Sequence, residues 1–191
     1  MSSLQQLTVS KMSQVKITPL YDITINASTA ASLSDGCIEV LSKVRPSWPS
    51  SEVQMEVFTD GLTNKLVGAW HGDKKDMVLV RIYGEDTNKY IDRDSEKENM
   101  KKMEEGGCGS KLYAAFNNGL SYEFVHGSTL QMEMLFDPEI YREVAKCVAK
   151  MHKIKIETDS VGMWSFLEKL IKLYPQHFVD AKKVNFSYTK Y

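Results

Sequence analysis

Three short stretches in the first half of the chain have the hydrophobic pattern of β-strands. Residues 52–58 alternate between polar and apolar positions, and residues 65–70 follow after a short turn. Residues 77–83 are apolar apart from Arg81. Because only short polar turns separate these stretches, consecutive strands are expected to pair antiparallel.

A charged helix and a hairpin follow along the chain. Residues 92–105 have a helical pattern that a run of glycines ends. Asn117-Asn118-Gly119 lies between two predicted strands, residues 112–116 and 120–125, which is a strong hairpin signal. The order strand, strand, strand, helix, strand, strand predicts an α+β fold, with an antiparallel sheet and one inserted helix.

The region before the first strand contains little periodicity. Residues 1–33 are rich in Ser, Thr and Gln and are predicted to form a flexible tail, with a short strand at Val15–Ile17. Ser34 or Asp35 is expected to cap a short helix that ends at the following prolines. Residues 34–125 would then form the mainly β lobe.

The last third of the chain is predicted to be helical. One helix runs from about Pro138 to His152, and a second runs from Val161 to Tyr174, each with an apolar face. Residues 126–191 are therefore separated from the β lobe as a helical segment. If their apolar faces are exposed, they favour association into a homo- or heterodimer.

Composition excludes some classes of partner. The 24 basic and 25 acidic residues give a formal net charge of −1, so binding to nucleic acid is not indicated. No run reaches the roughly 18 to 20 apolar residues that cross a bilayer, so no transmembrane segment is expected. The three cysteines and four histidines lack metal-ligand spacing, and a cytoplasmic location fits best.

Four features are candidates for binding chemistry, and each has a structural alternative. The turn around Gly61 could bring backbone N–H groups to phosphate oxygens, or it could be an ordinary turn. Arg81 either contacts phosphates and pairs with a helix carboxylate, or it reaches solvent from an edge strand. Helix 92–105 carries six acidic residues, and spacing alone selects none of them. The strand end Tyr122–Val125 either presents its backbone to a nucleotide base or is simply buried.

Five blocks of the sequence occur in an order that a known family shares. They are FTDGLTNKLVG, VLVRIYG, DRDSE, KLYAAFNNGLSYEFVHG and REVAKCVAKMHKI. Together they resemble the ethanolamine kinases, which belong with the choline kinases in a protein-kinase-like fold. The resemblance covers residues 53–155 and, more loosely, Trp164–Pro175. The residues of the two motifs TDG-x-TN-KL and FNNG-x-x-YEF favour an ethanolamine kinase over a choline kinase.

The resemblance implies roles in nucleotide binding for eight residues. They are Gly61, Thr63, Asn64, Arg81, Glu96, Glu123, Phe124 and Val125. The first three would form a turn over the phosphates, the next two an ion pair, and the last three the adenine hinge. The implied reaction transfers a phosphoryl group from ATP, with Mg, to the hydroxyl of ethanolamine. That step begins phosphatidylethanolamine synthesis by the CDP-ethanolamine route.

The sequence departs from the family in its second half. It contains no HNDL-like catalytic loop and no IDYE-like acidic motif to hold magnesium, so no catalytic base or metal ligand is assigned. The chain is therefore expected to be a truncated isoform or fragment with an incomplete helical lobe, inactive alone because phosphoryl transfer depends on those groups. The alternatives are a choline kinase and a non-catalytic protein that binds nucleotide or regulates a partner.

Overall fold

The computed structural model describes residues 18–58, 64–155 and 162–173. These residues divide into two compact units. The first unit contains a sheet and one α-helix, and the second contains three α-helices. The chain passes from the first unit to the second for the last time between His126 and Gly127, close to the predicted lobe boundary.

The sheet of the first unit has six strands in the spatial order β1-β5-β6-β4-β3-β2. Their bounds are Leu20–Tyr21 (β1), Gln54–Phe58 (β2), Lys65–Trp70 (β3), Val78–Ile82 (β4), Leu112–Phe116 (β5) and Gly119–Glu123 (β6). Four neighbouring pairs are antiparallel, but β1 runs parallel to β5. The predicted antiparallel sheet is therefore a mixed sheet, because an N-terminal strand adds to one edge.

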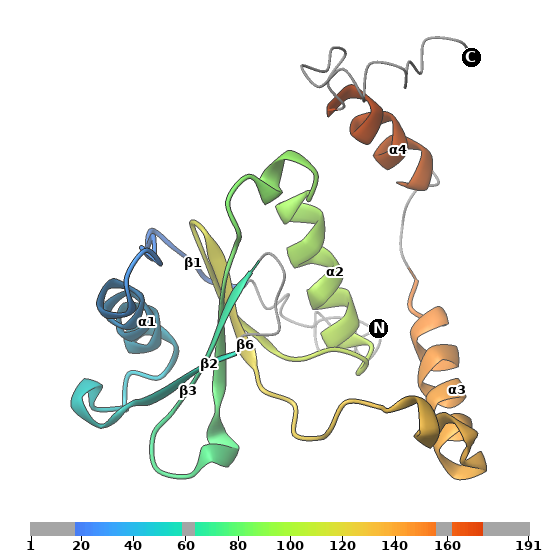
Figure 1. The fold of residues 1–191 in the computed structure, drawn as a ribbon, viewed down its shortest axis with the longest axis horizontal. Helices are drawn as coiled ribbons and strands as arrows, with labels where there is room; N and C mark the ends of the chain where they lie inside the picture. The colour runs from blue at the N-terminus through green and yellow to red at the C-terminus, as the bar shows by residue number, and fades with distance from the viewer. Residues whose placement is uncertain (1–17, 59–63, 156–161, 174–191) are drawn as a thin grey trace, which may run out of the picture. The chain divides into compact units, whose positions relative to one another are not determined.

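Helix α1 (Ala30–Val44) packs on one face of this sheet, as Figure 1 shows. Alternation along β4 directs Val78, Val80 and Ile82 into the shared core, where they meet Val40 and Cys37 of α1. Burial raises the pKa of the Cys37 thiol to about 12, so this cysteine stays protonated and acts as a small apolar side chain.

The predicted flexible tail is wrong over residues 18–33, and the reason lies in the hairpin between β5 and β6. The Asn118 side chain accepts a hydrogen bond from the Ile25 N–H (3.0 Å) and donates one to the Ile25 carbonyl (2.9 Å). Asn117 donates to the side chains of Asp22 and Thr24. These bonds fix the segment so that Ile25 is buried in the core.

The start of α1 also differs from the expectation. Thr29 caps the helix, because its side chain accepts a hydrogen bond from the Ser32 N–H while Ser32 bonds back to the Thr29 backbone. Ser34 and Asp35, the predicted caps, therefore lie inside the helix. The strand predicted at Val15–Ile17 lies outside the described residues.

The second unit contains α2, α3 and α4. Their bounds are Arg93–Glu105 (α2), Pro138–His152 (α3) and Gly162–Leu173 (α4), within one or two residues of the predicted helices. Hydrogen bonds from the backbone and side chain of Ser95 lower the pKa of the Asp92 carboxyl, which caps α2. Among the described residues, no helix is both long and apolar enough to span a membrane.

Large apolar side chains are exposed on both C-terminal helices, as their sequence led us to expect. They include Tyr141, Val148 and Met151 on α3 and Met163, Trp164, Phe166 and Ile171 on α4. The dimer inferred from such a surface stays a prediction.

We predict that Asn118→Asp destabilises the first unit. The carboxylate would still accept from the Ile25 N–H, but its second oxygen would face the Ile25 carbonyl with no hydrogen to share. Urea denaturation at neutral pH should show a loss of about 1–3 kcal/mol in the free energy of unfolding. Asn88→Asp, at an exposed position, is the matched control. Equal stability of the two variants would contradict the anchoring role of Asn118.

Candidate functional site

Arg81 lies on β4, inside the sheet. Its neighbours across the strands are Leu66 on β3 and Leu120 on β6. Because Val80 and Ile82 point to the core under α1, Arg81 points to the opposite face of the sheet. Its guanidinium carbon lies 5.6 Å from the centre of the Tyr122 ring. The edge-strand alternative for Arg81 is therefore wrong.

The chain that leaves β6 is held at both ends. The Glu123 N–H donates to the Lys111 carbonyl (2.9 Å), and the Glu123 carboxylate accepts from the Lys111 N–H (3.2 Å). The His126 ring nitrogen Nε2 lies 2.8 Å from the Lys75 carbonyl, and the Phe124 ring packs edge-on against His126. Within the described residues, the backbone groups of Phe124 and Val125 form no hydrogen bond. They are therefore available to a ligand, whereas the Glu123 N–H is not.

His126 is thus a residue that the sequence analysis missed. Its role is to fix the end of the segment that follows β6, which metal-ligand spacing in the sequence does not reveal. The imidazole connects this segment to the short 3-10 helix Lys74–Asp76 before β4. Sequence pattern offers little sign of such a bond, since the two residues are 51 positions apart.

In the second unit, hydrogen bonds connect Asn64 to the start of α2. The Asn64 side-chain oxygen accepts from the Gly84 N–H (3.4 Å), and the Gly84 carbonyl accepts from the Thr87 hydroxyl (2.9 Å). The same hydroxyl accepts a hydrogen bond from Arg93. Asn64 therefore belongs to a network that continues into the helix. Gly61 and Thr63, the other predicted residues of this turn, lie outside the described residues.

Arg93 organises this network. Its guanidinium forms an ion pair with Glu96 at 2.9 Å, and its carbon lies 3.7 Å from the centre of the Tyr83 ring. The Arg93 and Glu96 side chains are only 15% and 23% exposed, so solvent screens this pair less than most ion pairs on the helix. The ion pair expected between Arg81 and Glu96 stays a prediction.

Arg93 was not selected from the sequence, although its three-residue spacing from Glu96 could have indicated a pair on one face of a helix. Within the block DRDSE, the resemblance implies a role for Glu96 alone. No group of three His, Cys, Asp or Glu side chains forms a metal site within the part of the chain that the structure describes.

Comparison with known proteins identifies the relatives of this chain. The sequence profile of the choline/ethanolamine kinase family matches residues 55–191. Mouse (Mus musculus) ethanolamine kinase 1 is 37% identical over 166 residues, which cover 85% of this chain and 46% of the mouse protein. Human (Homo sapiens) ethanolamine kinase 1 is 36% identical, with coverage of 85% and 37%. The chain thus spans less than half the length of these relatives.

A solved structure supports the fold. The Plasmodium vivax ethanolamine kinase aligns with a TM-score of 0.59 at 23% identity, over 78% of this chain and 39% of that one. This likeness confirms the predicted kinase-like α+β fold, with the correction that the sheet is mixed. The family profile extends to residue 191, beyond the last block on which the resemblance was based.

We predict that Arg93→Met destabilises the second unit, because the change removes the ion pair with Glu96, the bond to Thr87 and the contact with Tyr83. The loss should be about 1–3 kcal/mol in the free energy of unfolding. Amide hydrogen exchange should also accelerate at Ile91, whose N–H donates to the Thr87 carbonyl.

Lys97→Met is the matched control for this experiment. Lys97 pairs with Asp94 at the same three-residue spacing on the same helix, but the Asp94 side chain is 93% exposed. Its loss should cost under about 0.5 kcal/mol. If the two variants are equally stable, Arg93 does not organise the start of α2.

Proposed function

The chain belongs to the choline/ethanolamine kinase family, and we propose that it provides the nucleotide-binding part of an ATP-dependent ethanolamine kinase. The complete enzyme would phosphorylate the hydroxyl of ethanolamine to give phosphoethanolamine, in the cytoplasm. The observation that carries this proposal is the family match, which spans all eight candidate nucleotide-binding residues. The choice of ethanolamine over choline as substrate rests on the names of the mammalian relatives and on the residues of the TDG-x-TN-KL and FNNG-x-x-YEF motifs.

Three features of the described residues support this proposal. The backbone of Phe124 and Val125 is available for the two-sided hydrogen bonding that an adenine edge requires, and His126 holds this segment in place. Arg81 presents a permanent positive charge from a rigid inner strand of the sheet, where it would bind phosphate oxygens. Asn64, together with Gly61 and Thr63, would cover the phosphates. In the complete enzyme, Mg would neutralise charge on the transferred phosphate.

Glu96 would act on the nucleotide through Arg81. A carboxylate at that position orients the guanidinium and offsets the cost of keeping a cation on an apolar strand. Since Arg93 already holds Glu96, we propose that Glu96 is shared between the two arginines when nucleotide binds. The two cations would then be positioned by one carboxylate.

Catalysis requires groups beyond these. A carboxylate must accept the proton of the substrate hydroxyl, and further oxygen ligands must hold Mg. We propose that these groups lie outside this 191-residue chain, which contains no HNDL-like or IDYE-like motif. The chain would then be a truncated isoform or fragment that binds nucleotide without turnover.

A second candidate function is a non-catalytic partner of a full-length kinase. The exposed apolar side chains of α3 and α4, among them Trp164 and Ile171, favour this alternative because such surfaces usually contact another protein. Association into a homo- or heterodimer would cover them.

We predict that Arg81→Ala weakens ATP binding roughly tenfold or more, because a charge-assisted contact to phosphate is lost. Titration calorimetry with ATP provides the measurement. Arg81→Lys should retain most of the affinity, since it keeps a cation at the same position. Arg142→Ala, at an exposed arginine of α3, is the control. Unchanged affinity in Arg81→Ala would refute the assignment of Arg81 to the phosphates.

We also predict that the purified 191-residue chain does not phosphorylate ethanolamine, because the base and metal ligands are missing from its sequence. Phosphoethanolamine would be quantified by mass spectrometry after incubation with ATP, Mg and ethanolamine. ATP binding measured on the same sample establishes that the protein is folded. Product above the level of a no-enzyme control would overturn this prediction, and a parallel reaction with choline would then test the alternative substrate.

A further inference from the structure

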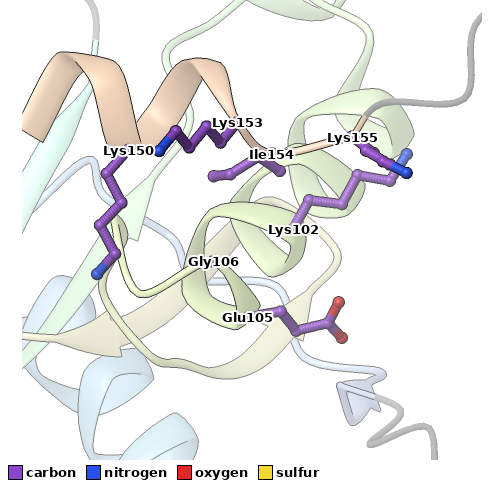
Figure 2. A pocket seen from close by; sticks show the side chains of 7 residues that line it. All are labelled: Lys102, Glu105, Gly106, Lys150, Lys153, Ile154 and Lys155. Atoms are coloured by element: carbon purple, nitrogen blue, oxygen red, sulfur yellow. The ribbon is translucent and has the colours of Figure 1, made fainter.

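The C-terminal ends of α2 and α3 meet in the second unit and line an open surface pocket of about 320 Å³. Its lining consists of Lys102, Glu105, Gly106, Lys150, Lys153, Ile154 and Lys155. Figure 2 shows that Lys102, Glu105 and Gly106 come from the end of α2, and that the other lysines come from the end of α3 and the residues after it. None of the candidate nucleotide-binding residues lines this pocket.

Close packing at two glycines holds the pocket together. A Cβ atom at Gly106 would lie 2.5 Å from Cδ1 of Ile154, so the Ile154 side chain packs directly on the backbone at the end of α2 and would have to shift if Gly106 were replaced. Gly107 has a φ of +63°, and its carbonyl accepts a hydrogen bond from the Lys150 ammonium at 2.8 Å. The two helix ends are therefore fixed to one another by both packing and a hydrogen bond.

The pocket has a surplus of positive charge. Its lining contains four lysines and one glutamate. Lys102 forms an ion pair with Glu98 at 2.7 Å, and the Lys150 ammonium donates a hydrogen bond to the Gly107 carbonyl. Lys153 and Lys155 have no carboxylate partner within the residues that the structure describes. The two helix ends add a partial negative charge of roughly −0.5 each, which offsets only part of the surplus.

We propose that this pocket binds a phosphate group, as inorganic phosphate or pyrophosphate, a soluble phosphomonoester, or the headgroup of an anionic lipid. Lysine ammonium groups bind phosphate as point charges and donate up to three hydrogen bonds each. The volume lies at the lower end of small-ligand pockets, which suits a phosphate group with a short substituent. A bound dianion also removes the repulsion between neighbouring ammonium groups, so the ligand stabilises the contact between α2 and α3.

Titration calorimetry with inorganic pyrophosphate, at constant ionic strength, tests this site on the 191-residue chain. The double variant Lys153→Gln/Lys155→Gln removes the two lysines that lack a carboxylate partner and should weaken binding roughly tenfold or more. Lys43→Gln/Lys146→Gln is the matched control, because it removes the same number of charges from α1 and α3 away from the pocket. It should bind pyrophosphate like the parent chain.

Arg81→Ala separates this site from the proposed nucleotide site. If pyrophosphate binding is lost in Arg81→Ala and kept in Lys153→Gln/Lys155→Gln, the phosphate binds at the nucleotide site and the pocket proposal is overturned. The same conclusion follows if the parent chain does not bind pyrophosphate, or if both lysine double variants lose affinity equally. Retained binding in Arg81→Ala with loss in Lys153→Gln/Lys155→Gln supports the pocket whether or not ATP binds elsewhere.

Sedimentation with vesicles identifies the source of the phosphate. Phosphatidylcholine vesicles that contain phosphatidic acid are compared with vesicles of phosphatidylcholine alone. Co-sedimentation that requires phosphatidic acid and is lost in Lys153→Gln/Lys155→Gln assigns a lipid headgroup. Pyrophosphate binding without co-sedimentation assigns a soluble phosphate.

Discussion

Strand β4 is the element on which the first unit depends. It lies between β3 and β6, and its alternate residues Val78, Val80 and Ile82 form the core with α1. A strand bonded on both sides and packed on one face is among the most rigid parts of a small fold. Arg81 inherits that rigidity, because its backbone cannot move without disturbing the strand pairs and the core together. A cation placed there is preorganised for an anionic ligand, which lowers the entropy lost on binding.

The β5–β6 hairpin closes this unit by a different kind of interaction. Gly119 approaches β4 so closely that a Cβ atom would lie 2.2 Å from the Arg81 carbonyl. On the other side of the same turn, the Asn118 amide bonds to both backbone groups of Ile25, as a neighbouring strand would. The turn therefore joins the N-terminal segment to the sheet and sets the start of β6, whose far end leads to Phe124 and Val125. A change in this turn that shifted the register of β6 would therefore also displace Phe124 and Val125, the residues of the proposed hinge.

Local pattern was sufficient for the elements whose partners are near in sequence. The hydrophobic pattern predicts the observed bounds of three elements, which are β3 (Lys65–Trp70), β5 (Leu112–Phe116) and α3. The segment around Ile25 could not be predicted in this way, because its partner Asn118 is 93 positions away. For the candidate site, pattern placed Arg81 on an apolar strand, but the roles of Arg93 and His126 depend on contacts with Thr87 and Lys75 that no repeat or motif encodes. The sequence of a helix also does not distinguish charged side chains that are partly buried in a hydrogen-bond network from those that solvent surrounds.

Helix α2 connects the two kinds of chemistry proposed for this chain. Its first turn carries Glu96 within the Arg93 network, and its last turn, at Lys102 and Glu105, lines the basic pocket. A net charge of −1 conceals this separation, because it averages over surfaces that would bind different groups. A helix of 13 residues transmits a displacement of one end to the other with little bending. A phosphate bound between the ends of α2 and α3 would therefore also restrict the position of Glu96, at the other end of α2.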